Sequence, residues 1–582
     1  MELSCLWWQR GVIYQIYPLS FQDTDGDGKG DLAGVLARLD YIDWLGVDAV
    51  WLGPVYPSPM ADFGYDITDF TDIDPVFGSL EDLDRVVESL HARGIRLILD
   101  FVPNHTSNAH LWFIESRSSR ENLKRDWYVW ADPAPDGGPP NNWLSRFGDS
   151  AWEWDGITGQ YYYHAFLKEQ PDLNWRNPQV RAAMADVLRF WLRRGIDGIR
   201  IDAAGVLAED ALLRDEPLNP EFNEGAPPVE RFKRIYTDSL PEVLEWLAEL
   251  RSVVDEFPGR VLLGEVDTSP ERIPDFYGDA KRPILHLPLN YRLLDTPWEG
   301  HKIGATVEEY RRSLPPHGWP DWVIGSHDKK RIARVLGRDA ARVAAMLFLT
   351  LPGTPIFYAG EELGMAGGAI NTEPVLDPFE RLVPGYGLNR DPERSPMQWD
   401  GSRNSGFTRG TPWLPVAGDY RECNYAVECG NPRSILNLYR RLIALRRDEP
   451  VLASGRYATV LMRSEIMAYM RSDASRRLMI VLNFSARAQI CSVPRAAGGR
   501  ILSRPIVTAI MRSSAREFRL AVTKGWSSLW KTHSSEARRA GNLPLLTLTW
   551  LAYNLAEGCV ALTSTPMAPC VAPFADMAQP PA

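Results

Sequence analysis

Residues 80–101 read LEDLDRVVESLHARGIRLILDF, in which a helical pattern over residues 80–93 leads into a short apolar run over residues 96–101. Apolar residues three and four positions apart fit one face of a helix, and the apolar run that follows fits a buried strand. Strand and helix patterns of this kind alternate through the first two-thirds of the chain, and residues 180–194 form a second clear helical segment. The alternation predicts βαβ units and a parallel sheet.

Eight apolar runs are expected to form the strands of this sheet. They lie at residues 12–17, 49–53, 96–101, 198–202, 261–266, 284–289, 322–325 and 354–358. Eight parallel strands, each followed by a helix, are what a closed TIM barrel requires. The expected fold class is therefore α/β, with a (β/α)8 barrel as its architecture.

Two long connections interrupt the alternation. Residues 105–177 form an aromatic stretch rich in turn residues after the third strand, and residues 364–421 form an irregular insert after the eighth. Connections of this length are usually functional, and both would overhang the C-terminal rim where barrel enzymes have their active sites. We expect a catalytic barrel over residues 1–104 and 178–444, with residues 105–177 as an inserted subdomain.

Residues 445–582 are expected to form a smaller C-terminal β domain. Within it, residues 456–462, 466–471 and 478–484 fit antiparallel strands. From about Arg504 onward, a Ser-, Arg- and Ala-rich helical composition replaces the strand and turn signals. A divergent terminus and a shifted reading frame would both produce such a tail.

The bulk composition limits the possible partners and the compartment. The chain has 582 residues. A single hydrophobic core stops growing at roughly 250–300 residues, so several structural units are expected. A net charge of −11 disfavours nucleic acid, which needs a basic surface. The six cysteines form no CxxC pair, and neither a signal peptide nor a clean membrane span is evident, the nearest being residues 543–562. We expect a cytoplasmic monomer or homodimer without a membrane partner.

Charged and polar residues directly follow four of the predicted strands. The third strand ends in DFVPNH, the fourth in GIRID, the fifth in GE and the seventh in SHD. Any one of these endings could belong to a structural ion pair. Because barrel catalytic residues come from the ends of several strands, four such endings indicate a site that contains Asp202, Glu265 and Asp328.

Three carboxylates at one rim fit the chemistry of glycoside hydrolysis. Clustered carboxylates raise one another's proton affinity, so one can remain a protonated acid while another stays an ionised nucleophile. A retaining mechanism places these two about 5–5.5 Å apart and forms a covalent glycosyl-enzyme intermediate. Arg200 lies two residues before Asp202 and shares its face of the strand, where it would keep the nucleophile ionised. His105 and His327 would supply hydrogen bonds to sugar hydroxyls.

The blocks DFVPNH, GIRID, GEV and HD resemble, in order and spacing, the conserved regions of the α-amylase family, glycoside hydrolase family 13. The resemblance covers about residues 7–485. It implies Asp202 as nucleophile, Glu265 as general acid/base and Asp328 as transition-state stabiliser. The segment QPDLN at residues 170–174 is similar to that of the α-glucosidase and oligo-1,6-glucosidase branch, which implies short substrates. One departure is Ser326, where the family usually has Asn, and its shorter side chain could loosen the strand end.

The same resemblance implies a pocket for a terminal glucose. Asp62 would bind its hydroxyls and Tyr65 would be its stacking platform, although such a turn could also be simple aromatic packing. Further positions that match the family's pocket are Phe166, Gln170 and Arg394. Arg390 is a close competitor for the place of Arg394.

The expected activity is the release of glucose from the non-reducing end of short α-glucosides. In the resembling enzymes Val after the nucleophile goes with α-1,6 linkages, and Ala or Thr with α-1,4, so Ala203 implies maltose-like or sucrose-like substrates. Transglucosylation, trehalose synthesis or sucrose isomerisation would use the same residues, because an alcohol can take the covalent intermediate instead of water. A non-catalytic, transporter-associated barrel is a third class; loss of Asp202 or Glu265 would indicate it, and both are present.

Residues 23–31 form a candidate site for Ca²⁺ or Mg²⁺. The segment DTDGDGKGD offers the carboxylates of Asp23, Asp25, Asp27 and Asp31 and the backbone carbonyl of Lys29. These are the hard oxygen ligands of such cations, but position twelve is not the Glu that an EF-hand needs. The resembling glucosidases carry a metal at this loop, which implies a structural ion away from the carboxylate cluster. A Gly-rich acidic turn without metal is the alternative.

Overall fold

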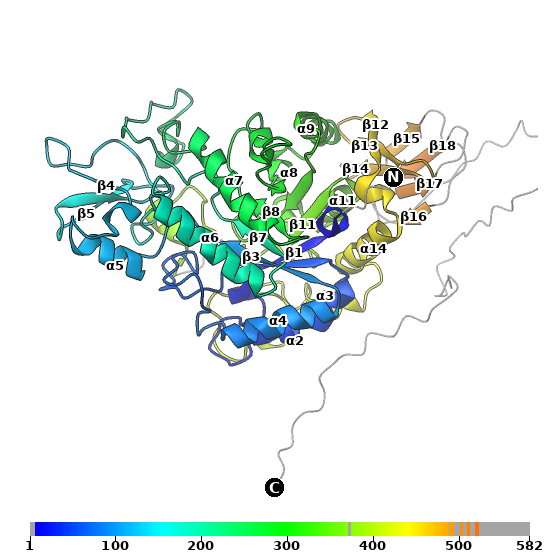
Figure 1. Ribbon diagram of the computed structural model, residues 1–582. Coiled ribbons are helices and arrows are strands. Elements are labelled where there is room, and N and C mark those ends of the chain that lie inside the picture. Colours follow the sequence, from blue (N-terminus) through cyan, green and yellow to red (C-terminus); the bar gives the residue numbers. More distant parts are fainter. Residues whose placement is uncertain are drawn as a thin grey trace, which may run out of the picture. The chain divides into compact units, whose positions relative to one another are not determined.

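The computed structural model describes residues 6–369, 374–487, 489–493, 501–503, 509–512 and 518–522. The chain divides into two units, Met1–Lys524 and Gly525–Ala582. The first unit contains all the helices and strands labelled in Figure 1. The second unit, with the apolar stretch at residues 543–562, lies outside the described residues.

Eight parallel strands form a nearly closed barrel, as the sequence predicts. In chain order they are β1 (Ile13–Ile16), β2 (Ala49–Leu52), β3 (Arg96–Phe101), β7 (Gly198–Ile201), β8 (Val261–Gly264), β9 (Leu287–Pro288), β10 (Asp321–Ile324) and β11 (Thr354–Tyr358). Their order in the sheet is β10-β11-β1-β2-β3-β7-β8-β9, with every neighbouring pair parallel. Each predicted strand is present, and β9 is the one that is much shorter than expected.

The barrel closes between β9 and β10 through side-chain as well as backbone groups. The Val323 N–H donates to the Asn290 carbonyl oxygen at 3.2 Å. The Asp321 carboxylate accepts a hydrogen bond of 2.8 Å from the Asn290 N–H. Pro288 ends β9 early because it has no N–H to donate to a ladder. The seam therefore depends on Asn290, which lies two residues beyond the end of β9.

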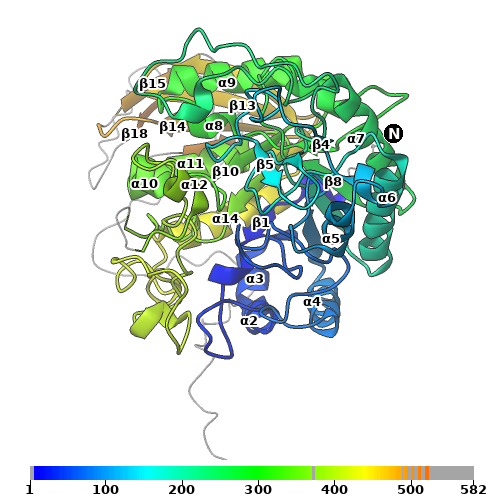
Figure 2. The ribbon, with the colours of Figure 1, turned by 90° about the vertical axis from the view of Figure 1, so that its left-hand side faces the viewer.

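Helices surround the barrel (Figures 1 and 2), and their apolar faces belong to the same buried cluster as the outer side chains of the strands. The main ones are α2 (Leu32–Ala37), α3 (Leu39–Leu45), α4 (Leu80–Ala92), α6 (Pro178–Arg193), α7 (Pro241–Asp255), α8 (Arg292–Asp295), α9 (Gly300–Ser313), α10 (Ile332–Leu336), α11 (Arg338–Thr350) and α14 (Ile435–Asp448). Helix α4 begins at a capping box in which Ser79 and Asp82 satisfy each other's backbone N–H groups. None of the helices in the described part of the chain is long and apolar enough to cross a membrane.

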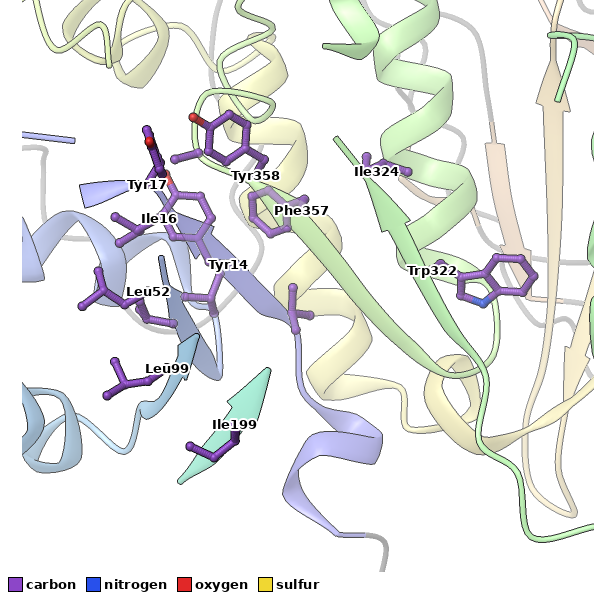
Figure 3. Packing of buried hydrophobic residues seen from close by; sticks show 14 of the residues in the cluster. Tyr14, Ile16, Tyr17, Leu52, Leu99, Ile199, Trp322, Ile324, Phe357 and Tyr358 are labelled. Atoms are coloured by element: carbon purple, nitrogen blue, oxygen red, sulfur yellow. The ribbon is translucent and has the colours of Figure 1, made fainter. Parts of the chain in front are cut away.

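Alternation along the strands separates two apolar layers. The layer inside the barrel includes Ile13, Trp51, Ile98, Leu263 and Val323. Their chain neighbours belong to the outer layer against the helices, part of which Figure 3 shows with Leu52, Leu99 and Ile199 labelled. Successive side chains of a strand point to opposite faces, so the residues two positions beyond the inner layer also face the barrel axis. Among these positions are the polar rim residues Gln15, Asp100 and Glu265.

Two inserts extend beyond this rim. The first, between β3 and α6, contains α5 (Leu111–Ser118) and a three-stranded antiparallel sheet of β4 (Trp130–Ala131), β5 (Trp152–Asp155) and β6 (Gln160–Tyr163), in the order β4-β6-β5. The second, between β11 and α14, contains the short helices α12 (Pro378–Leu382) and α13 (Tyr425–Cys429). The rings of Phe147 and Phe379 pack edge to face at 5.2 Å, so the two inserts meet.

Antiparallel strands follow the barrel, as expected. A five-stranded sheet has the order β12-β13-β14-β17-β16, with bounds Arg456–Met462, Ile466–Ser472, Arg477–Asn483, Ala509–Arg512 and Ile501–Ser503. Strand β15 (Gln489–Val493) pairs with β18 (Phe518–Val522). Strands β17 and β18 lie in the segment after Arg504 whose composition favours helix, and they pair with β14 and β15. The rest of the predicted atypical tail lies outside the described residues.

Candidate active site

Side chains from the C-terminal ends of several barrel strands enclose one small pocket, of about 70 Å³. Its lining consists of Asp62, Tyr65, His105, Phe147, Phe166, Gln170, Asp202, Ala203, Glu265, Asp328 and Arg390. The three predicted catalytic carboxylates therefore come together, with five of the eight predicted substrate-binding residues. A larger surface depression of about 890 Å³ beside α4 and α6 contains none of these rim residues.

Arg200 organises one end of the pocket. Its side chain is buried, and its Nη1 and Nη2 atoms lie 2.7 Å from Asp202 Oδ1 and 2.7 Å from Glu265 Oε2. Nη1 also donates to Asp100 Oδ1 at 3.1 Å. The expected contact between Arg200 and Asp202 is thus present, and one planar guanidinium holds the predicted nucleophile and acid/base side by side.

The pKa values of Asp202 and Asp328 are shifted in opposite directions, although burial acts on both in the same way. Loss of solvent raises the pKa of Asp202 well above its ordinary value, Arg200 opposes this, and the nearby carboxylates of Glu265 and Asp100 add to it. Burial alone would also raise the pKa of Asp328, but the neighbouring His327 and the positive charges of Arg390 and Arg394 outweigh it and hold that pKa well below the usual range. Asp328 therefore stays ionised, whereas Asp202 is protonated more easily than an exposed aspartate.

Arg390 lines the pocket and pairs with two of its carboxylates. Its Nη2 lies 3.3 Å from Asp62 Oδ1, and its Nη1 lies 3.1 Å from Asp328 Oδ1. Arg394 is fully buried and does not line the pocket. It donates to Asp328 Oδ1 at 2.6 Å and to the His327 carbonyl oxygen at 3.2 Å. Of the two arginines weighed from the sequence, Arg390 lines the pocket and Arg394 supports Asp328 from behind.

A hydrogen-bonded row of neutral groups forms one side wall. Gln170 Nε2 lies 3.0 Å from His105 Nε2 and donates to Asp62 Oδ2 at 3.3 Å. His105 Nε2 also lies 3.0 Å from the Tyr65 carbonyl oxygen. Burial lowers the pKa of His105 to about 4, so the imidazole is neutral near pH 7. Neutral donors and acceptors of this kind suit uncharged sugar hydroxyls.

His327 lies beneath the pocket, and sequence reasoning missed the residue that orients it. Gln15 Nε2 lies 2.9 Å from His327 Nδ1, and Tyr65 Oη lies 2.7 Å from His327 Nε2. Tyr65 Oη also donates to Asp100 Oδ2 at 2.9 Å. The Tyr65 hydroxyl is therefore held by His327 and Asp100, while the residue also lines the pocket. The signal for Gln15 was available, because it is two residues beyond the inner-layer Ile13 on β1.

Ser326, the departure from the usual family pattern, is buried and makes a local hydrogen bond. Its Oγ accepts from the Asp328 N–H at 3.2 Å. The shorter side chain therefore still holds the end of the strand that carries Asp328.

The predicted metal loop brings three of its four carboxylates together. Single oxygen atoms of Asp23, Asp25 and Asp27 lie within 4.8 Å of one another. Asp31 instead caps α2, because its carboxylate accepts from the Gly34 N–H at 2.5 Å and from Thr24. The oxygen donor set fits Ca²⁺ or Mg²⁺, with Asp31 bracing the loop.

Comparison with known proteins agrees with this geometry. A family model described as the catalytic domain of α-amylase matches residues 15–455. The chain belongs to the α-amylase family. The probable α-glucosidase of Rhizobium meliloti (strain 1021) is 43% identical over 507 residues, which are 84% of this chain and 91% of that protein.

Two solved structures, of a transfer enzyme and of a synthase, are also similar. An α-glucosyl transfer enzyme has a TM-score of 0.82 at 38% identity, covering 89% of this chain and 100% of the other. A mutant isomaltulose synthase of Erwinia rhapontici NX5, in complex with sucrose, has a TM-score of 0.80 at 32% identity, covering 88% and 100%. The family predicted from four short blocks is confirmed, and the protein is a glycoside hydrolase.

Proposed function

We propose that this protein is a retaining, exo-acting α-glucosidase that releases glucose from the non-reducing end of short α-glucosides, with α-1,4-linked maltose preferred. The observation that supports exo action is the Arg390–Asp62 ion pair across one end of the pocket. The acid/base Glu265 stands at the Arg200 end, where the leaving group must depart. The end beyond Arg390 therefore faces the non-reducing side of the bound glucose and leaves no path for a longer chain.

The proposed reaction has two steps at the anomeric carbon. Asp202 attacks that carbon while Glu265 gives its proton to the glycosidic oxygen, so a carboxylate–carbon bond forms as the glycosidic bond breaks. Glu265, now ionised, takes a proton from water, whose oxygen displaces Asp202 and releases glucose with its original configuration. The shared contact with Arg200 supports this reading, because it keeps the two carboxylates close together. Asp328 would stabilise the positive charge of the transition state.

Linkage preference is proposed from Ala203. Its backbone N–H lies 3.4 Å from Glu265 Oε2, so its methyl group borders the space on the leaving-group side. A small side chain there leaves room for an α-1,4-linked sugar. Steady-state kinetics on maltose, isomaltose, sucrose and trehalose should give the highest kcat/KM for maltose. Absence of glucose release from all four would contradict the proposed function.

Glucosyl transfer or sucrose isomerisation is the alternative function. It is supported by the similarity to a solved transfer enzyme and a solved isomaltulose synthase. The same covalent intermediate would be taken by a sugar hydroxyl instead of water. Product analysis on maltose and sucrose separates the two activities. Free glucose as the main early product supports hydrolysis, whereas elongated or rearranged disaccharides support transfer.

We expect the kcat/KM for maltose to fall as the pH drops through about 6. Burial raises the pKa of Asp62 to about 6, although Arg390 and Arg394 lower it in part. The pKa of Asp202 is also raised, and both groups must be ionised, one to bind hydroxyls and the other to attack. Since kcat/KM reports ionisations of the free enzyme, a pH profile tests this directly. An acid limb near the ordinary aspartate pKa of about 4 would contradict it.

A structural Ca²⁺ or Mg²⁺ at Asp23, Asp25 and Asp27 is proposed as a second feature. The ion would screen three carboxylates that otherwise repel one another, and it would add stability because it binds only the folded loop. Chelation should therefore lower the melting temperature more than it lowers the rate of the remaining folded enzyme. Differential scanning calorimetry with and without EDTA tests this, with Asp25→Asn as a variant that should abolish the difference. An identical melting curve after chelation would count against a bound ion.

A further inference from the structure

The closed end of the pocket depends on one flexible side chain held across it. Arg390 reaches Asp62 and Asp328 on its pocket side through Nη2 and Nη1. A free arginine side chain loses rotamer entropy when it is fixed in one conformation. Contacts behind the guanidinium must therefore offset this cost if the barrier is to be permanent.

Asp377 supplies those contacts. Its side chain is fully buried and accepts from the Arg390 backbone N–H at 2.6 Å, from Nε at 3.0 Å and from Nη2 at 2.7 Å. It also caps α12 by accepting from the Phe379 N–H at 3.2 Å. Arg390 holds the pKa of Asp377 below its ordinary value in spite of burial, so the pair is ionic. Asp377 does not line the pocket itself.

Helix α12 is in turn fixed against the inserted subdomain. Phe379 packs on Phe147, and the Arg390 guanidinium lies 5.2 Å from the centre of the Phe147 ring. At Gly148, where φ is +120°, an added Cβ would overlap Val383. This close approach leaves little freedom for α12 to move away from the pocket. Both inserts thus support the side of Arg390 that faces away from the substrate.

We propose that Asp377 is a positioning residue that locks Arg390 across the blind end of the glucose pocket. It acts through Arg390 and not on the substrate. Asp377 accepts from the backbone N–H, the Nε and the Nη2 of Arg390. The Nη1 of Arg390 is then left to contact Asp328, and Nη2 also reaches Asp62. Without Asp377, the Arg390 side chain can move away from the pocket. The site then binds a single glucose less tightly and no longer excludes longer chains. The inference rests on the proposed glucosidase function.

Asp377→Asn and Asp377→Ser test the proposal, because Asn and Ser still cap a helix but lack the charge that pairs with Arg390. Glu380→Gln is the matched control. Glu380 is in the same helix and accepts from the Gly385 and Leu388 N–H groups, at 2.9 and 3.2 Å, without contacting Arg390. The measurements are the affinity for glucose by calorimetry, kcat and KM for maltose, the ratio of maltose to glucose released from p-nitrophenyl α-maltoside, and the melting temperature.

Both Asp377 variants should lose about 10- to 100-fold in glucose affinity and in kcat/KM, because a misplacement of about 1 Å by a remote group has effects of this size. They should also begin to release maltose from the maltoside. Glu380→Gln should stay within about twofold in both quantities. Equal glucose affinity in wild type and both Asp377 variants, with only the melting temperature lowered, would overturn the inference. Failure of the wild type to hydrolyse maltose, with glucose still bound, would overturn the proposed function alone.

Discussion

Replacement of Asp202 by Asn is expected to reduce kcat/KM for maltose by about six orders of magnitude, as for the loss of a catalytic nucleophile in other hydrolases. An amide cannot form the covalent bond to the anomeric carbon. Its size is unchanged, and the Arg200 guanidinium keeps Glu265 and Asp100 as partners. The fold should therefore persist, and circular dichroism with thermal melting should show this. Retention of even a tenth of the activity would refute the assignment of Asp202 as nucleophile.

The loss should also be specific for the chemical step. Glucose should still bind to Asp202→Asn, because Asp62, His105 and Arg390 remain in the wall. Isothermal titration with glucose measures this directly. A variant that is inactive, folded and unable to bind glucose would place Asp202 in binding and not in catalysis.

Arg200→Met is expected to affect both stability and activity strongly. Arg200 is the buried partner of Asp100, Asp202 and Glu265, and breaking such pairs typically costs about 3–5 kcal/mol. With the guanidinium gone, the folded-state pKa of Asp202 should rise further above its unfolded value. A raised folded pKa means that stability is lost as the pH increases, so the deficit relative to wild type should widen from acid to neutral pH. Activity should fall at least about 100-fold, because both reacting carboxylates lose their common support.

Arg96→Met is the matched control at the other end of the barrel. Arg96 pairs with buried Asp197, but His91 and Arg260 contact the same carboxylate, at 2.6 and 2.9 Å. Its loss should therefore cost less than about 1 kcal/mol and leave kcat/KM unchanged. Urea denaturation of both variants over a pH series provides the comparison. Equal destabilisation by the two substitutions would show that the cluster around Arg200 has no special role.

The barrel and its reacting end could be predicted because both follow from local patterns. Period-two alternation on short strands determines which residues face the axis, and Asp202 and Glu265 each follow an apolar strand directly. Arg200 could be placed beside Asp202 by the same rule. Strand β9 is shorter than predicted mainly at its start, where residues 284–286 precede it, and Pro288, which has no N–H to donate, accounts only for its early end.

The closed end of the pocket could not be predicted in the same way. Phe147, Asp377 and Arg390 lie on irregular inserts, whose side chains are directed by tertiary contacts such as that between Phe147 and Phe379. No periodicity relates these residues to the barrel axis. Motif matching alone could not choose between Arg390 and Arg394, which are four residues apart. Only the geometry distinguishes the arginine in the wall from the one behind Asp328.

The stereochemistry of the first product tests the central claim most directly. Proton NMR during the first minutes of maltose hydrolysis, before mutarotation equilibrates the anomers, reports which configuration is released. Two carboxylates held on one guanidinium should act by double displacement, so α-glucose should accumulate first. Accumulation of β-glucose would mean a single displacement by water, and it would contradict the covalent mechanism assigned to Asp202.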